Sequence, residues 1–211
     1  MVLLSGEAGI GKSRLVQTLK EQTVAEDATR IEFRCSPYHQ NSALYPLIEH
    51  LQRLLQFAPH ETPQAKLAKL THLLMHYRFP QADTLPLLAA LLSLPHPDGA
   101  PPLTLSPQKQ KQKTQEALVA WMVEEAERQA VYGAWEDLHW ADPSTLEVLT
   151  LYLDQVPTTR LLAVLTFRPD FTPPWRPRSH VTQLTLNRLG RPHVEAMVEN
   201  LTGGKAFPTP E

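Results

Sequence analysis

The stretch that decides the fold reads GEAGIGKS and covers residues 6–13. It fits the spacing G-x-x-x-x-G-K-[ST], in which glycines let successive backbone N–H groups turn toward the oxygens of a phosphate. Lys12 adds charge for the β- and γ-phosphates of a nucleotide, and the Ser13 hydroxyl is suited to ligate Mg²⁺. The predicted nucleotide-binding residues are Gly6, Glu7, Ala8, Gly9, Ile10, Gly11, Lys12, Ser13 and Arg14.

The segments on either side of this loop distinguish it from a chance match in a turn. Residues 1–5 are mostly apolar and predict a buried strand, whereas residues 12–24 carry apolar side chains at helical spacing. The chain holds only 8 glycines, and three of them fall within residues 6–11, which indicates a demand on the backbone. A strand, a glycine loop and a helix in this order favour a phosphate-binding loop.

Strands and helices alternate along the rest of the chain. Ser106-Pro107 and Asp142-Pro143 each place a capping side chain before a proline at the first helical position, which predicts two helix starts. This alternation predicts an α/β fold with a largely parallel sheet. Beyond the first strand and helix, strands are predicted at 30–35, 131–135, 161–167 and 181–186, and helices at 44–57, 107–129, 143–155 and 190–201.

Prolines divide residues 58–105 into short apolar segments, at 67–75 and 85–94, and Pro86 is one of the dividing residues. Proline removes a helical hydrogen bond and ends or kinks a helix. We therefore expect a helical insertion with stiff joints and an exposed loop at 96–102.

Acidic residues follow the strand predicted at 131–135. ATP hydrolysis at a phosphate loop needs a carboxylate near Mg²⁺ and a group that orients the attacking water. Glu136 and Asp137 are the candidates for both tasks, and which acid performs which task stays open. The alternative is a solvated polar turn.

Arg168 follows the strand predicted at 161–167. Carboxyl ends of parallel strands line the ligand crevice, so Arg168 is a candidate to contact a γ-phosphate; the alternative is a surface arginine before Pro169. We interpret His139 and Trp140 as packing and capping groups, and Asp142 as a helix cap.

Composition excludes several classes of protein. The formal net charge of −2 argues against a general nucleic-acid binder, and a single cysteine, Cys35, excludes a disulfide framework. The apolar run from Leu85 to Leu94 is too short to cross a bilayer. The first residues lack the features of a secretory signal, so the cytoplasm is the default location and no membrane partner is expected.

Four segments together resemble the STAND-class signalling ATPase module, within the AAA-like branch of P-loop NTPases. The chain looks most similar to modules attached to bacterial class III adenylate/guanylate cyclase homologues and to tetratricopeptide-containing regulators. The segments are GEAGIGKSRL (6–15), RCSPYHQNSALYPLIEHLQRLL (34–55), EDLHWADPSTLE (136–147) and LTFRPDF (165–171), with weaker support from 184–208.

This resemblance implies a five-stranded core of order 5-1-4-3-2, with the strand at 161–167 between the phosphate-loop strand and the acidic strand. It implies ATP and Mg²⁺ as cofactors, with Ser13, Glu136 and Asp137 at the metal and Arg168 as a γ-phosphate sensor. Family members act mostly as slow switches. They hold ATP or ADP and change how a lid, sensor and output domains and neighbouring subunits pack, so homo-oligomers are possible partners.

The sequence departs from the family pattern in three places. Gly133 interrupts the acidic strand and predicts weak packing there, because glycine weakens a strand interior. The chain starts five residues before the phosphate loop and stops at Glu211, so we expect a fragment of a larger regulator, truncated at both ends. Residues 181–211 then form the start of a lid region, the adenine is poorly enclosed, and the apolar face of the last helix lacks its partner.

Two other function classes remain open at this point. One is a module that binds nucleotide, or a degenerate protein-interaction module, without hydrolysis. The other is a small-molecule kinase, although an arginine-rich lid is missing and EDLHWADPST points elsewhere. Nucleotide affinity and phosphate release with and without acceptors separate these classes.

Overall fold

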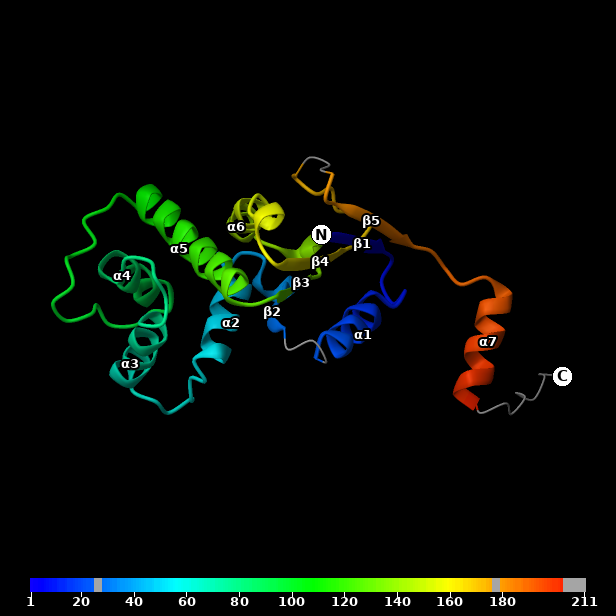
Figure 1. Ribbon diagram of the computed structural model, residues 1–211, viewed down its shortest axis with the longest axis horizontal. Coiled ribbons are helices and arrows are strands. Elements are labelled where there is room, and N and C mark those ends of the chain that lie inside the picture. Colours follow the sequence, from blue (N-terminus) through cyan, green and yellow to red (C-terminus); the bar gives the residue numbers. More distant parts are fainter. Residues whose placement is uncertain (25–27, 176–178, 203–211) are drawn as a thin grey trace.

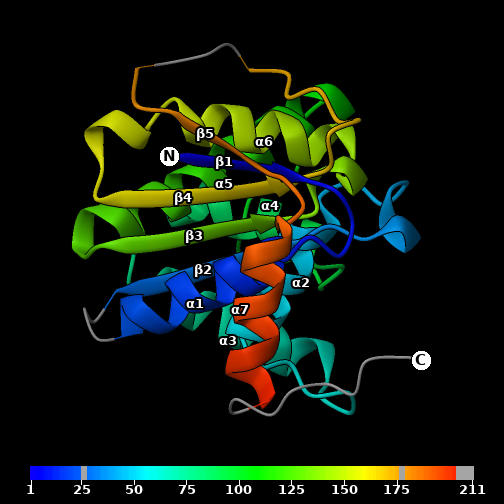
Figure 2. The ribbon, with the colours of Figure 1, turned by 90° about the vertical axis from the view of Figure 1, so that its right-hand side faces the viewer.

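Five parallel strands form one sheet in the computed structural model, which describes residues 1–24, 28–175 and 179–202. The order across the sheet is β2-β3-β4-β1-β5, so β4 lies between β1 and β3 as predicted (Figures 1 and 2). The strands are β1 (Val2–Gly6), β2 (Thr29–Arg34), β3 (Val131–Glu136), β4 (Leu161–Phe167) and β5 (Thr182–Leu186).

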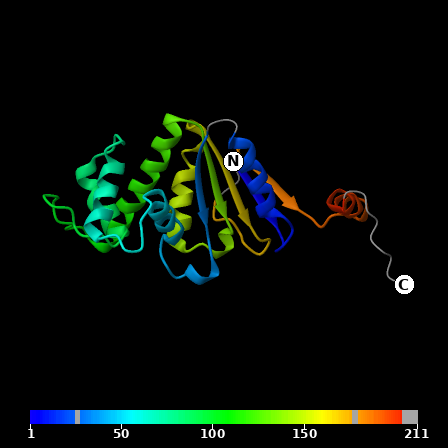
Figure 3. The ribbon, with the colours of Figure 1, turned by 90° about the horizontal axis from the view of Figure 1, so that it is seen from below.

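Helices cover the two faces of this sheet unequally (Figure 3). On one face lies α1 (Lys12–Val24), whose Val16 packs against Tyr132 and Ala134 of β3. On the other face lie α2 (Tyr45–Leu54), α5 (Pro107–Arg128) and α6 (Pro143–Leu153), which enclose the larger hydrophobic core. Alternation along β3 divides its side chains between these layers, since successive residues of a strand point to opposite faces.

Two helix starts follow the capping logic of the sequence. The Ser106 side chain accepts a hydrogen bond from the Lys109 N–H at the start of α5. Asp142 accepts hydrogen bonds from the N–H groups of Ser144 and Thr145 at the start of α6. Both predicted caps are confirmed, and each satisfies N–H groups that a helix start leaves without a partner.

The proline-rich segment contains two helices, α3 (Pro63–Leu74) and α4 (Gln81–Leu91), beside α5 and away from the sheet (Figure 1). The prediction that Pro86 forms a joint was wrong, because it lies inside α4 and is buried. Its missing N–H would have bonded the carbonyl of Ala82, which is an exposed residue.

Gly133 does not leave β3 poorly packed, which corrects a second expectation. All six residues of β3 are buried, and the strand pairs with β2 and β4. A Cβ at Gly133 would meet the Leu161 Cδ1 atom at 3.3 Å and the Tyr152 hydroxyl at 3.9 Å. Neighbouring side chains therefore fill the space that glycine leaves.

The last described helix, α7 (Arg191–Thr202), stands apart from the sheet and has no buried residue (Figure 1). Val194, Met197 and Leu201 are 45%, 53% and 76% exposed, in line with the expected uncovered apolar face. The described residues also form three short 3₁₀ turns, η1 (Pro37–His39), η2 (Leu138–Trp140) and η3 (Val156–Thr158). Among the described helices, none has the length and apolar character needed to cross a bilayer.

Candidate functional site

The loop between β1 and α1 depends on glycine for two different reasons. Gly9 and Gly11 have φ angles of 75° and 104°, a region that side-chain-bearing residues rarely adopt. Gly6 has an ordinary φ, but a Cβ there would come within 2.8 Å of the Ile10 Cγ2 atom. Together these glycines allow a backbone path that residues with side chains cannot follow.

Lys12 crosses the inside of this loop. Its Nζ atom donates hydrogen bonds to the Gly6 carbonyl at 2.7 Å and to the Glu7 carbonyl at 2.8 Å. Burial lowers the pKa of Lys12, while the nearby Asp137 charge raises it and Arg168 lowers it. Because an ammonium group has three donors, one N–H remains for an anion in the loop.

A cavity of about 300 Å³ opens beside the loop and collects most of the predicted residues. The loop supplies one wall of the cavity. Asp137, which directly follows β3, and Arg168, which directly follows β4, also line it. The cavity is thus built where strands end, at the carboxyl edge of the parallel sheet. Its lining residues are Ala8, Gly9, Gly11, Lys12, Ser13, Arg14, Asp137 and Arg168.

Glu136 is placed differently from Asp137 and does not line this cavity. Its Oε1 atom lies 3.2 Å from a guanidinium nitrogen of Arg34, the residue opposite it in the β2–β3 register. The ion pair raises the pKa of Arg34. The other oxygen, Oε2, is buried and has no hydrogen-bond partner among the described residues. Glu136 is therefore held at the end of β3 with one of its two carboxylate oxygens paired.

Asp137 turns toward the cavity because its backbone leaves the strand conformation. Its φ and ψ angles of 59° and 44° lie in the left-handed region, which aspartate tolerates better than most residues. Its N–H donates to the Thr166 hydroxyl at 3.0 Å, and Thr166 is only 1% exposed. This bond fixes the end of β3 to the end of β4, so Asp137 and Arg168 are held near one another.

Arg168 and the segment after Asp137 form one side of the site. The guanidinium carbon of Arg168 lies 5.4 Å from the centre of the Trp140 ring, within the range of a cation–π contact. Both ring nitrogens of His139 are buried without a partner in the described part of the chain. Burial lowers the pKa of His139, and the Arg168 charge adds to that effect.

No role was predicted from the sequence for Arg34 or Thr166, although both hold candidate acids in place. A polar Thr166 inside the apolar run at 161–167 is a usable signal, since buried polar groups require a partner. Arg34 offers no comparable signal, because its pairing with Glu136 depends on the strand register.

Asp142 has a second task besides capping α6. Its Oδ2 atom accepts a hydrogen bond from the backbone N–H of Leu44 at 3.2 Å, and Leu44 has a φ angle of 60°. The carboxylate thereby ties the segment before α2 to the start of α6. This role of Asp142 is structural, and it stabilises the carboxyl edge of the sheet.

Residues 1–165 match the AAA ATPase domain family. The chain belongs to that family. Membership explains why a phosphate-type loop and paired acids meet at one edge of the sheet, and it implies that this AAA ATPase domain binds nucleotide.

Two individual proteins are also similar to this AAA ATPase domain. An uncharacterized protein of Rhizobium meliloti (strain 1021) is 27% identical over 194 residues, which are 90% of this chain and 18% of that protein. The chain thus spans about a fifth of that relative's length. The structure of VirB4 of Thermoanaerobacter pseudethanolicus has a TM-score of 0.39 at 12% identity, over 96% of this chain and 80% of that one.

The donor set at this edge fits a magnesium ion. Mg²⁺ prefers a few oxygen ligands together with water and substrate phosphates. Ser13 and Asp137 line the same cavity, whereas Glu136 lies outside it, with its unpartnered Oε2 atom buried at the end of β3. These are the three residues that the sequence predicts for the metal.

Proposed function

We propose that this AAA ATPase domain is an ATP-binding, slowly hydrolysing switch module of a larger regulator. The observation that carries the proposal is the arrangement of charged residues around one cavity. Lys12, Asp137 and Arg168 come from three separate elements and line the same space of about 300 Å³. Arg14 lines the same cavity, so three cations and one acid meet at the glycine loop, which suits a triphosphate and the water that attacks it.

Each residue then has a role that its position supports. The N–H groups of residues 8–13 and the start of α1 hold the β-phosphate, while the remaining N–H of Lys12 reaches the γ-phosphate. Ser13 and the two acids hold Mg²⁺, which neutralises charge on the phosphates when bound. Asp137 lines the cavity and orients the attacking water, and Arg168 contacts the γ-phosphate.

The ion pair of Glu136 supports the proposal of slow turnover. Arg34 occupies one of its carboxylate oxygens in this structure, which leaves fewer lone pairs for metal or water. A nucleotide state that persists is what a switch requires, since its output depends on the population of each state. The partners we propose are ATP, ADP, sensor and output domains of the same regulator, and a second copy. The proposed location is the cytoplasm.

Residues 58–105 form a helical insertion in this proposal, and residues 181–211 form the start of the lid region. The insertion lies on the α5 side of the molecule, whereas α7 lies beyond β5 (Figure 1). Neither segment contributes a lining residue to the cavity among the residues described.

The experiment compares phosphate release and ATP affinity in the parent and in a Glu136→Gln/Asp137→Asn protein. We expect ATP to bind the variant while phosphate release falls at least tenfold, because positioned acid–base groups contribute about 10²–10⁴ in rate. A matched control is Asp83→Asn/Glu116→Gln, which changes two exposed acids on α4 and α5. A variant that hydrolyses at the parent rate contradicts the proposal. A parent that binds ATP without hydrolysing it favours the binding-only alternative.

A further inference from the structure

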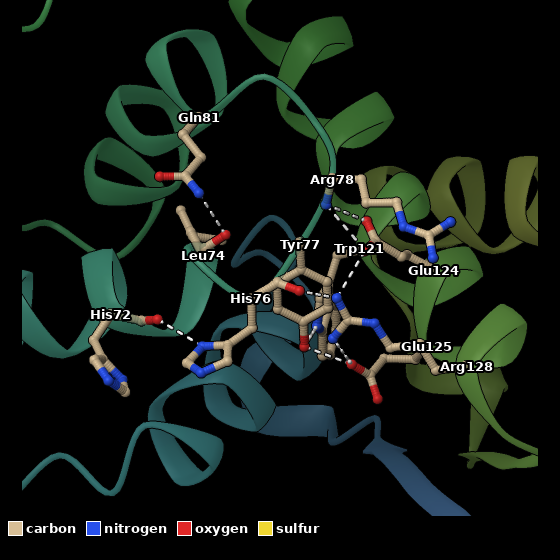
Figure 4. A network of polar contacts seen from close by, with 10 residues as sticks. All are labelled: His72, Leu74, His76, Tyr77, Arg78, Gln81, Trp121, Glu124, Glu125 and Arg128. Atoms are coloured by element: carbon tan, nitrogen blue, oxygen red, sulfur yellow. Dashed lines mark hydrogen bonds and ion pairs between the residues drawn. The ribbon is translucent and has the colours of Figure 1, made fainter.

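Two histidines lie side by side at the end of α3, on the opposite side of the large core from the cavity at residues 8–14. His72 is in the last turn of α3, and His76 follows four residues later (Figure 4). Both side chains are exposed, and their ring centroids are 5.0 Å apart. His76 lies in the turn that follows the end of α3 at Leu74, and this turn keeps its ring beside that of His72. The four-residue separation is that of paired histidine ligands in helical metal sites.

The hydrogen bond of His76 determines which of its nitrogens is free. Its Nδ1 atom lies 2.9 Å from the backbone carbonyl of His72. A carbonyl can only accept, so Nδ1 carries the proton and Nε2 keeps its lone pair. A backbone carbonyl that holds one imidazole nitrogen while the other faces a metal is a common arrangement at metal sites.

The separation of the two rings also suits one shared ion. With a metal–nitrogen bond of about 2.0 Å, two imidazoles bound at roughly right angles have centroids about 4.5 Å apart. Widening the angle to the tetrahedral value increases this separation to about 5 Å. The observed 5.0 Å is about 0.5 Å wider than right-angle coordination requires, a gap that rotation of the two exposed rings can close.

A polar network holds the turn that carries His76 (Figure 4). Arg128 of α5 donates to the His76 carbonyl, and its guanidinium carbon lies 4.4 Å from the centre of the Tyr77 ring. The Tyr77 hydroxyl donates to Glu125 at 2.5 Å and accepts from the Trp121 indole at 3.0 Å. The backbone on which His76 sits is therefore fixed before any ion binds, which lowers the entropy cost of binding.

The charges around the pair do not oppose a cation. Both histidines line a shallow hollow between the end of α2 and α3, and Lys69 is its one charged lining residue. The Lys69 ammonium is 2.9 Å from the Glu61 carboxylate and also donates to the Gln56 carbonyl. Its positive charge is compensated locally. The Arg128 guanidinium beside the His76 carbonyl is likewise paired, at 2.8 Å from the Glu124 carboxylate.

We propose that His72 and His76 form a two-nitrogen site for a divalent transition metal, with Cu²⁺ bound most tightly. The described residues offer no third histidine, cysteine or carboxylate beside the pair, which argues against a closed tetrahedral zinc site. Two imidazoles with water at the other positions suit the tetragonal coordination of Cu²⁺, the strongest binder of the divalent series. Mg²⁺ prefers oxygen ligands and does not compete.

The test titrates the nucleotide-free chain with Cu²⁺ and follows electron paramagnetic resonance. We expect one site with the nitrogen splitting of two imidazoles in the parent protein. His72→Gln and His76→Gln should each weaken Cu²⁺ binding at least tenfold and remove the two-nitrogen signal. His60→Gln changes an exposed histidine elsewhere and should leave both measurements unchanged.

Three outcomes would overturn the site. The first is parent-like binding by His72→Gln, whose exposed side chain can change without loss of the fold. The second is a one-nitrogen signal in the parent. The third is release of Cu²⁺ by excess Mg²⁺, because that would place the ion at Ser13, Glu136 and Asp137.

Discussion

Arg34 and Glu136 are the last residues of two neighbouring strands, and their side chains form an ion pair at 3.2 Å across the parallel register. The two partners differ strongly in exposure, since the Arg34 side chain is 68% exposed and that of Glu136 only 9%. An exposed cation thus compensates a nearly buried carboxylate. Removing Arg34 destabilises the folded state mainly because it leaves the nearly buried Glu136 carboxylate without its partner.

A double-mutant cycle on this pair should show measurable coupling in stability. We expect Arg34→Ala to lower the free energy of unfolding by roughly 1 kcal/mol, a modest value because Arg34 is largely solvated. In a Glu136→Gln background the same change should cost less, since no charge then remains unpaired. Urea unfolding of the four proteins measures the coupling. If Arg34→Ala lowered the free energy of unfolding equally in both backgrounds, the ion pair would contribute nothing to stability.

Lys12→Ala should weaken ATP binding at least tenfold, because it removes the charge held inside the phosphate loop. The fold should persist, since the Nζ atom bonds only two carbonyls of the same loop. Calorimetric titration with ATP measures the loss, and circular dichroism reports the fold. Lys109→Ala is the matched control, because Lys109 lies in the first turn of α5 and is exposed. Undiminished affinity in a folded Lys12→Ala protein contradicts the assignment.

The sequence predicted the strands and most helix starts because their signals are local. GEAGIGKS requires a strand before it and a helix after it, and Asp142-Pro143 is a complete capping signal. The apolar run at 161–167 is a buried strand by composition alone, and the central place of β4 in the sheet came from the family resemblance. Every one of these features can be recognised without knowing what lies opposite it.

The remaining features depend on neighbours that a linear sequence does not display. Gly133 alone predicts a weak strand, but in the folded protein Leu161 and Tyr152 fill the space beside it. Pro86 alone predicts a joint between helices, and only the folded structure shows that it lies inside α4. The difference between Glu136 and Asp137 depends on Arg34 and on the backbone turn at Asp137, both set by tertiary contacts.

Arg168→Ala should weaken ATP binding more than ADP binding, and it should therefore reduce the preference for ATP over ADP. Arg168 lines the same cavity as the glycine loop. In the proposed function it contacts the γ-phosphate, which ADP lacks. A charge-assisted hydrogen bond contributes about 1.5–3 kcal/mol, which corresponds to a preference of tenfold or more. Competition between ATP and ADP measures the ratio in both proteins. Arg160 precedes β4 at the end of the strand opposite to Arg168, so Arg160→Ala should keep the parent ratio. A parent ratio in Arg168→Ala would refute the contact.

His50 should make the fold less stable as pH falls. It packs between Phe33 and Trp121, and burial with the Arg53 charge lowers its pKa to about 4. The unfolded chain has the ordinary value near 6.5, so below pH 6.5 it binds a proton that the folded chain refuses. The stabilisation is complete above pH 6.5 and is lost progressively toward pH 4, by an amount on the order of 3 kcal/mol.

His50→Phe isolates this effect, because it keeps an aromatic ring in place and removes the titration. The difference between the parent and variant unfolding free energies should change between pH 7 and pH 4 and then level off. Carboxylates that titrate in the same range cancel in that difference. A difference that is independent of pH would mean that folded His50 accepts a proton as readily as the unfolded residue.

Gly133→Ala should leave stability within about 1 kcal/mol of the parent, because two opposing effects are of similar size. Alanine restricts the unfolded chain, which stabilises the fold by about 0.4–1 kcal/mol. Its Cβ would press on the Leu161 Cδ1 atom at 3.3 Å, the end of a half-buried side chain that can shift. Gly133→Val adds two further methyl groups inside a fully buried strand, so it should lower the free energy of unfolding by about 1–3 kcal/mol. Urea unfolding ranks the variants, and an alanine as costly as the valine would show that Leu161 and Tyr152 cannot yield.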